Sequence, residues 1–227
     1  MDNIDRLFDG ISNRYDRFNH LSSMGIERRW RRQAVDSLPH CERVLDVATG
    51  TADYAIAAVL RSKAERVVGI DISEGMLSVG REKVVRKNLS EKIGLMHADV
   101  AALPFEDASF DAITCGYGVR NFAQLQQSLS EMHRVLKPGG QLRILEFTYP
   151  TRPLVRGVYN LYFSYVMPLI GRLLTHDKGA FNYFMHSVKA FPKREEFVKI
   201  LSDVGFKEAG YRSQTFGISS LYSASKQ

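Results

Sequence analysis

Short apolar runs that alternate with helical patterns are the feature of this sequence that most constrains its fold. Five such runs occur, at residues 43–47, 66–70, 93–98, 110–115 and 142–147. Helical patterns separate most of them, at residues 52–61, 73–87 and 122–136. Strands that alternate with helices in this way predict an α/β domain, in which a doubly wound and mostly parallel sheet carries crossover helices on both faces.

Residue types that favour helix ends mark several boundaries. Ser73 is an N-cap residue for the helix that follows it. The Lys-Pro-Gly-Gly sequence at residues 137–140 should stop the preceding helix and turn the chain sharply. An amphipathic helix over residues 193–203 should end at Gly205.

The remaining segments predict one closing hairpin and two helical additions. Residues 206–212 and 216–223 have strand character, and we expect an antiparallel hairpin at the sheet edge that brings the sheet to seven strands. Residues 1–39 and 151–190 have helical patterns. We expect an N-terminal helical cap and an inserted helical lid above the carboxyl edge of the sheet, all within a single domain of 227 residues.

Aspartates close three successive strands, at Asp46, Asp71 and Asp99. In an open α/β sheet, ligands bind outside the carboxyl ends of the strands. Asp71 follows Gly50 by about the twenty residues expected of a carboxylate that accepts from ribose hydroxyls. A single aspartate at a strand end is often only a helix cap, but three in succession indicate a cofactor of the adenosine type.

The loop at residues 46–52 restricts which adenosine cofactor is expected. It has a single glycine and no lysine, so it matches neither the dinucleotide fingerprint nor a phosphate-cradling P-loop. S-adenosylmethionine has no phosphate and carries a sulfonium cation, which neighbouring carboxylates favour. The sequence also lacks H-E-x-x-H, C-x-x-C and G-x-S-x-G, so it predicts no metal site and no acyl-enzyme chemistry.

The formal net charge of +6 is compatible with an acidic binding partner. Four arginines surround Trp30, at positions 28, 29, 31 and 32. They form either a solvated helix face or a contact with a membrane surface or nucleic acid. The sequence shows no basic stripe interleaved with aromatics, so nucleic acid is disfavoured. Two cysteines and a charged N-terminus favour a cytoplasmic protein, peripheral at most to the inner face of the cell membrane.

Two stretches carry a family resemblance: YDRFNHLSSMGIERRWRR from Tyr15 to Arg32, and ALPFEDASFDAITCGYGVRN from Ala102 to Asn121. With them, the chain resembles the UbiE/MenG family of ubiquinone and menaquinone biosynthesis C-methyltransferases over nearly its whole length. The resemblance implies a Rossmann-like class I fold and S-adenosylmethionine as cofactor.

The resemblance also implies site residues, which we carry over by position. It implies cofactor contacts at Thr51 in the loop, at Asp71 on the ribose, at Asp99 and Val100 beside the adenine, and at Gly116, with Asp46 shaping the loop that contains Gly50. The chain departs from the family in its glycine-poor loop, at Thr49 and Ala52, and in carrying Tyr222 where the family tends to have a histidine.

The implied reaction is methylation of a ring carbon of a prenylated quinol, with demethylmenaquinol favoured. A benzoquinol precursor of ubiquinone or another small apolar molecule remains an alternative, and an RNA methyltransferase is a weaker one. Loss of a hydroxyl proton makes the ring carbon nucleophilic, so a cation should stabilise the phenolate. Arg120 is the first candidate, with a structural ion pair as its alternative. Tyr15 and Asp16 are weaker candidates for positioning or proton transfer, and packing or capping explains them equally well.

Aromatic and aliphatic residues in the lid recur at helical spacing, at Tyr159, Tyr162, Phe163, Val166 and Ile170. Such a face is usually a core stripe, but it also fits an apolar tunnel for an isoprenoid tail. A bilayer-dissolved substrate requires contact with the membrane surface, which the arginine cluster could provide. The sequence leaves the oligomeric state open, a homodimer included.

Overall fold

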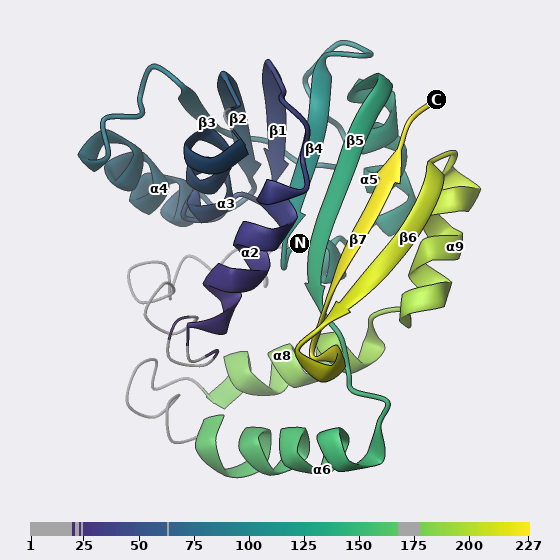
Figure 1. The fold of residues 1–227 in the computed structure, drawn as a ribbon. Coiled ribbons are helices and arrows are strands. Elements are labelled where there is room, and N and C mark those ends of the chain that lie inside the picture. The colour runs from purple at the N-terminus through teal and green to yellow at the C-terminus, as the bar shows by residue number, and fades with distance from the viewer. Residues whose placement is uncertain (1–19, 21–22, 24, 63, 168–177) are drawn as a thin grey trace.

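The computed structural model describes residues 20, 23, 25–62, 64–167 and 178–227, and its centre is a seven-stranded sheet (Figure 1). The strands are β1 (Arg43–Val47), β2 (Arg66–Asp71), β3 (Ile93–His97), β4 (Phe110–Gly116), β5 (Leu136–Phe147), β6 (Lys207–Gln214) and β7 (Ser219–Ser225). Their order in the sheet is β3-β2-β1-β4-β5-β7-β6. This order confirms the predicted doubly wound architecture.

The strand register shows where the order reverses. Val47 at the end of β1 pairs with Ile70 of β2 on one side and with Cys115 of β4 on the other, both in parallel. The chain therefore winds outward in both directions from β1 and β4, which defines the topological switch point. β7 pairs antiparallel with both β5 and β6, so the predicted edge hairpin is confirmed.

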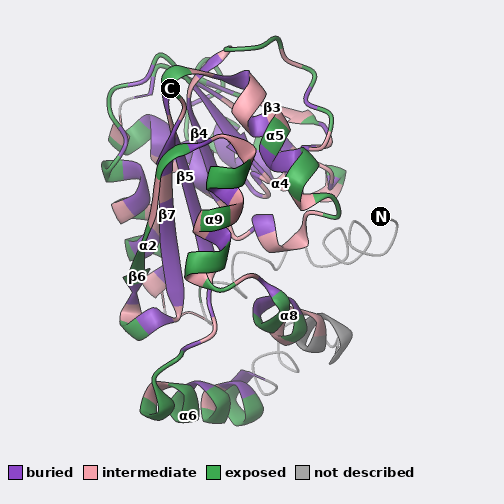
Figure 2. Ribbon diagram, turned by 90° about the vertical axis from the view of Figure 1, so that its right-hand side faces the viewer, coloured by how far each residue is buried: buried purple, intermediate pink, exposed green. Residues whose placement is uncertain are grey.

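Helices cover both faces of the sheet. They are α2 (Ile26–Asp36), α3 (Asp53–Ala57) with its π-helical extension η1 (Ala58–Ser62), α4 (Glu74–Arg86), α5 (Leu125–Val135) and α9 (Arg194–Val204). Alternate strand residues separate the two cores: Leu45 packs with α5 and α9, whereas Val44 packs with α3 and α4. Figure 2 shows the resulting buried strands between more exposed helices.

Two predicted helix ends have different outcomes. The Ser73 Oγ accepts a hydrogen bond from the Met76 N–H at 3.1 Å, which confirms the N-cap. The helix before Lys-Pro-Gly-Gly does end, at Val135, but β5 begins immediately at Leu136 instead of after a turn. Gly139 has a φ of +78° and donates its N–H to the Lys226 carbonyl at 2.7 Å. The glycines thus produce an irregularity within the strand, where the pairing with β4 shifts register.

Three helical segments follow β5: α6 (Pro153–Leu161), the π-helical turn η3 (Tyr162–Val166) and α8 (Lys178–Ala190). Figure 1 places α6 and α8 beyond the carboxyl end of β5. Tyr159, Phe163 and Met167 form a small buried cluster there. Val166, predicted on the same face, is 42% exposed, because the wider π-helical turn rotates it off that face. Ile170 lies outside the described residues.

Among the described residues, no helix is both long and apolar enough to cross a bilayer.

Candidate active site

A cleft opens at the carboxyl edge of β1, β2 and β4, next to the switch point, with an empty volume of about 970 Å³ including its open mouth. Five residues predicted to bind the cofactor line it: Gly50, Asp71, Asp99, Val100 and Gly116. Its walls also include Met76, Tyr117, Asn121 and Phe122. The structure therefore brings together most of the predicted cofactor residues, which come from four separate segments of the chain.

The loop after β1 has a left-handed backbone at alternate residues. Ala48, Gly50 and Ala52 have φ values of 52°, 53° and 65°. Such angles suit glycine, and they cost an alanine roughly 1 kcal/mol or more. At Gly50 no heavy atom lies within 4 Å of the position that a Cβ would take. The loop thus has the tight curvature of a glycine-rich loop although it contains only one glycine.

Asp71 connects the end of β2 to this loop. Its Oδ2 accepts the Gly50 N–H at 2.8 Å, and its Oδ1 accepts the Ser73 N–H at 2.9 Å. The residue lines the cleft, where its carboxylate can also accept from the hydroxyls of a ribose. Asp99 is similar, with Oδ1 accepting the Ala101 N–H at 2.9 Å.

Asp46 and Thr51, also predicted at the cofactor, do not line the cleft. Asp46 is fully buried, and its two oxygens accept from the Thr49 and Thr114 hydroxyls at 2.6 and 2.7 Å. Burial raises the pKa of Asp46 to about 6, against the effect of these hydrogen bonds. Asp46 therefore lies beneath the loop and holds it in shape.

Thr51 belongs to a polar network behind the loop. Its hydroxyl accepts from the Lys83 Nζ at 3.1 Å, and the same ammonium pairs with Asp53 at 2.5 Å. Arg31 approaches the other oxygen of Asp53 at 3.3 Å. Coulombic attraction to Arg31 and Lys83 lowers the pKa of Asp53 in spite of its burial. One arginine of the predicted cluster is therefore directed inward, where it ties α2 to the start of α3, directly after the loop.

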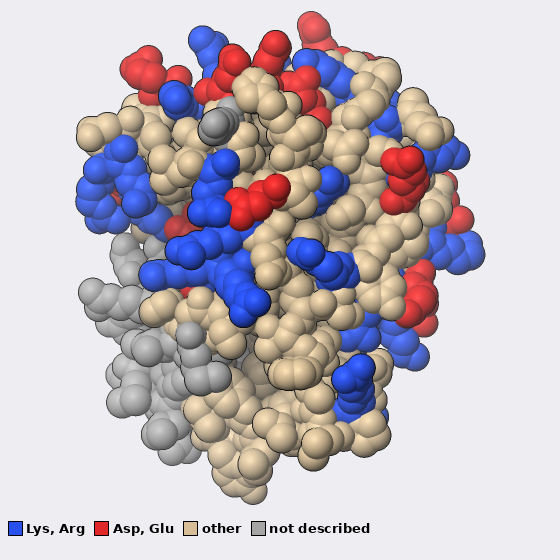
Figure 3. Space-filling view, in the orientation of Figure 1, with Lys and Arg blue, Asp and Glu red and all other residues tan. Residues whose placement is uncertain are grey.

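The other three arginines of that cluster, at positions 28, 29 and 32, are exposed. Figure 3 shows basic side chains gathered over α2 on the face turned to the viewer.

Arg120 lies in a buried ion pair. It follows β4 in the 3-10 turn η2 (Val119–Asn121), and its Nη1 donates to Glu146 Oε1 at 2.7 Å and to the Tyr117 carbonyl. Its Nε lies 3.3 Å from the Ser187 hydroxyl of α8. Burial raises the pKa of Glu146, and the adjacent guanidinium opposes that rise. Arg120 therefore does form the structural ion pair that was its alternative role in the sequence-based prediction.

Tyr117 and Asn121 are among the cleft residues that the sequence did not predict. Tyr117 follows Gly116 with a left-handed φ of 62°, and its ring stacks on Phe147 at 4.4 Å. Within the described part of the chain its buried hydroxyl has no hydrogen-bond partner. The side-chain Oδ1 of Asn121 accepts from the Tyr183 hydroxyl of α8 at 2.9 Å. Their only sequence signal was their place inside the stretch that carries the family resemblance.

The remaining candidates have different outcomes. Tyr15 and Asp16 are outside the described residues. Tyr222, at the position where the resembled family tends to have histidine, is fully buried in the main core, with its ring 4.8 Å from that of Phe197. It takes no part in the cleft.

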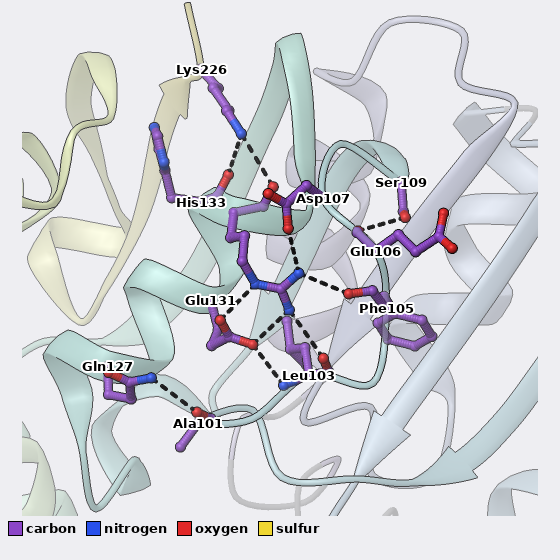
Figure 4. A network of polar contacts seen from close by, with 11 residues as sticks. Ala101, Leu103, Phe105, Glu106, Asp107, Ser109, Gln127, Glu131, His133 and Lys226 are labelled. Atoms are coloured by element: carbon purple, nitrogen blue, oxygen red, sulfur yellow. Dashed lines mark hydrogen bonds and ion pairs between the residues drawn. The ribbon is translucent and has the colours of Figure 1, made fainter.

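Arg134 fixes the loop that leaves the cleft after Val100 (Figure 4). The guanidinium of this α5 residue binds both oxygens of Glu131 at 2.7 Å, the Asp107 carboxylate at 2.8 Å and two loop carbonyls. Glu131 in turn accepts the Leu103 N–H at 2.9 Å. Hydrogen bonding to Arg134 lowers the pKa of Glu131. One ion-pair network therefore holds the loop against α5.

The cleft fits an adenosine cofactor without phosphates. Carboxylates of Asp71 and Asp99 supply acceptors for sugar hydroxyls, and apolar walls such as Val100 and Met76 suit a purine ring. Together with the strand order, this arrangement defines a class I S-adenosylmethionine-dependent methyltransferase. A solved S-adenosylmethionine-dependent methyltransferase from Aquifex aeolicus has the same fold, with a TM-score of 0.60 and 21% identity over 83% of this chain and 84% of that one.

The chain belongs to the ubiE/COQ5 methyltransferase family, whose sequence profile matches residues 1–226. It is 46% identical to a demethylmenaquinone methyltransferase of Bacteroides fragilis over 225 residues, covering 98% of this chain and 92% of that one. It is 44% identical to the ubiquinone/menaquinone biosynthesis C-methyltransferase UbiE of Geobacter sulfurreducens, covering 97% of this chain and 87% of that one. These findings confirm the family expected from the sequence.

Proposed function

We propose that this protein transfers a methyl group from S-adenosylmethionine to a ring carbon of a prenylated quinol, with demethylmenaquinol as the favoured substrate. The names of the Bacteroides and Geobacter relatives support this reaction. The cleft supports the cofactor, because its carboxylates and apolar walls suit adenosine. The cofactor supplies the methyl group on a sulfonium, and the residues of this chain align and activate the acceptor.

The observation that carries the substrate class is a row of aromatic rings that leads away from the cleft. Tyr117 in the cleft wall stacks on Phe147 at 4.4 Å, and Phe147 meets Phe184 of α8 at 5.2 Å. Phe184 stacks on Phe163 at 5.7 Å, and Phe163 lies 4.3 Å from Tyr159 of α6. An apolar row of this kind suits an isoprenoid tail, with the ring at the Tyr117 end and the tail directed toward α6.

Arg120 is our candidate for stabilising the phenolate. Its guanidinium is held by Glu146, and it lies 5.6 and 5.3 Å from the ring centres of Phe147 and Phe184, beside the proposed path. Among the described residues none accepts from its Nη2, which leaves that amino group for a substrate oxygen. A fixed cation favours the negative charge that develops when the hydroxyl loses its proton. Tyr15 and Asp16 remain our candidates for substrate positioning or proton transfer.

The test uses purified protein, S-adenosylmethionine and a short-tailed demethylmenaquinone under strict anaerobic conditions, with and without a reductant. We expect one methyl group to be added only when the quinone is reduced, because only the quinol has an electron-rich ring. The benzoquinol counterpart, assayed in parallel, decides between the two ring types that the relatives' names allow. Equal rates with oxidised and reduced substrate would contradict the mechanism, and no methylation of any quinol would contradict the function.

A further inference from the structure

The helix that ends the aromatic row has a second, exposed apolar face. Leu154, Val158, Leu161 and Tyr165 recur at four- and three-residue steps along α6 and η3. Each is between 61% and 81% exposed, whereas Tyr159 and Phe163 on the opposite side are buried. Figure 2 shows α6 as a largely exposed helix at one end of the molecule. We call these four residues the outer face of α6.

The segment that contains α6 is strongly basic. Arg152, the N-cap residue, and Arg156 are exposed at the start of the helix, although helical spacing places Arg156 away from the outer face. Across residues 151–193 the sequence contains six lysines and arginines and a single aspartate. An exposed apolar helix face within a segment that has an excess of cations suits a helix that lies in the plane of an anionic bilayer. Four large apolar side chains exposed together usually mark a contact surface, whereas a surface that faces only water has mostly polar and charged side chains in such positions.

We propose that the outer face of α6 docks on the surface of an anionic lipid bilayer, with its apolar side chains at the acyl boundary, and that the positive charge of the segment, Arg152 and Arg156 included, attracts it to lipid phosphates. The proposal rests on the proposed function, since the buried side of the same helix begins the aromatic row to the cleft. A quinol would thus leave the bilayer at the helix that contacts it. The membrane contact is assigned to α6, in contrast to the sequence-based hypothesis that assigned it to the arginines around Trp30.

The first experiment is flotation with lipid vesicles. Wild-type protein should bind mixed phosphatidylcholine–phosphatidylglycerol vesicles, and the variant Leu154→Ser/Val158→Ser/Leu161→Ser should bind them about tenfold or more weakly. The matched control is Leu60→Ser/Val85→Ser, which changes apolar residues of similar exposure, 61% and 64%, on η1 and α4. This control should bind as the wild type does. Arg152→Gln/Arg156→Gln should remove the preference for anionic over neutral vesicles.

Two outcomes would overturn the docking proposal. One is vesicle binding that the triple variant does not weaken more than the control does. The other is a triple variant that dissociates an oligomer in sedimentation without changing vesicle binding, which would assign the face to a second copy of the chain.

A separate assay distinguishes failure of the docking proposal from failure of the proposed function. With a water-soluble, short-tailed demethylmenaquinol and no vesicles, the triple variant should methylate at the wild-type rate. Loss of vesicle binding in a protein that methylates no quinol would refute the function and leave the docking surface standing. Methylation without any vesicle binding would refute the docking and leave the function standing.

Discussion

Arg120 and Glu146 form an ion pair from which water is almost excluded. Their charged groups lie 2.7 Å apart, and the two side chains are 6% and 0% exposed. Glu146 also accepts the backbone N–H of Arg120 at 3.2 Å and that of Phe147 at 2.8 Å. Each charge is therefore stable at its site only while the other is present.

Arg120→Ala should lower both stability and activity, so the two effects have to be separated. Removing one partner of a buried pair costs about 3–5 kcal/mol of unfolding free energy, measured by urea denaturation. Arg120→Met/Glu146→Gln should recover most of that loss, because no unpaired charge remains. If Arg120 stabilises the phenolate, the double variant should still lose about 100- to 1000-fold in single-turnover methyl transfer. A stable double variant with the wild-type rate would show that Arg120 is purely structural.

Arg120→Lys supplies the conservative comparison. A lysine retains the charge but not the planar fork that contacts Glu146, the Tyr117 carbonyl and Ser187 together. We expect it to recover only part of the single-turnover rate, while binding of S-adenosylmethionine stays near the wild-type value. Calorimetry on the same preparations measures that binding.

Asp71→Ala should weaken binding of S-adenosylmethionine strongly. Loss of ribose hydrogen bonds to a charged acceptor costs about 1.5–3 kcal/mol each, and the loop would also lose its contact at the Gly50 N–H. Titration calorimetry measures the affinity, with the exposed Asp36→Ala as a matched control. Near-normal affinity in Asp71→Ala would remove this residue from the cofactor site.

Asp46 should make stability fall as pH rises through the mildly acidic range. Its pKa is about 6 in the folded protein and about 3.9 unfolded. The folded state therefore binds the proton more tightly, and its stabilising effect is complete below about pH 4 and lost as pH rises through 6, an effect of about 3 kcal/mol. Asp46→Asn should abolish this slope, so unfolding free energies of the two proteins, measured from about pH 4 to 7, should differ by a pH-dependent amount. A constant difference would contradict the raised pKa.

Arg134→Ala should impair cofactor binding from outside the cleft. Without Arg134, the loop from Ala101 to Asp107 is held to α5 only through Glu131 and Gln127, so Asp99 and Val100 should be positioned less firmly. We expect the Kd for S-adenosylmethionine to rise by roughly tenfold, with a smaller change in the single-turnover rate at saturation. Arg61→Ala, which breaks an exposed two-bond pair with Asp36, is the control and should leave the Kd unchanged. An Arg134→Ala protein with wild-type affinity would show that the loop holds its position without the contacts of Arg134.

Much of the fold follows from local patterns. The strand–helix alternation, the Ser73 cap and the edge hairpin depend on residues close together in the chain, and all three are confirmed. The gathering of the strand-end aspartates could be predicted equally well, because parallel strands necessarily bring their carboxyl ends to one edge of the sheet. The exceptions were local irregularities, such as the π-helical turn that exposes Val166 and the glycines that deform β5.

The sequence by itself determined the α/β class, the order of structural elements and the gathering of Asp71 and Asp99 at one edge of the sheet, because periodicity and strand ends are local properties. The family resemblance added Val100 and Gly116. Only the tertiary structure decided that Thr51 belongs to a polar network behind the loop and that Arg120 is paired with Glu146. It also decided that α6 buries one aromatic face and exposes another. Burial and long-range charge pairing depend on which distant segments meet in space, and no spacing along the chain specifies that.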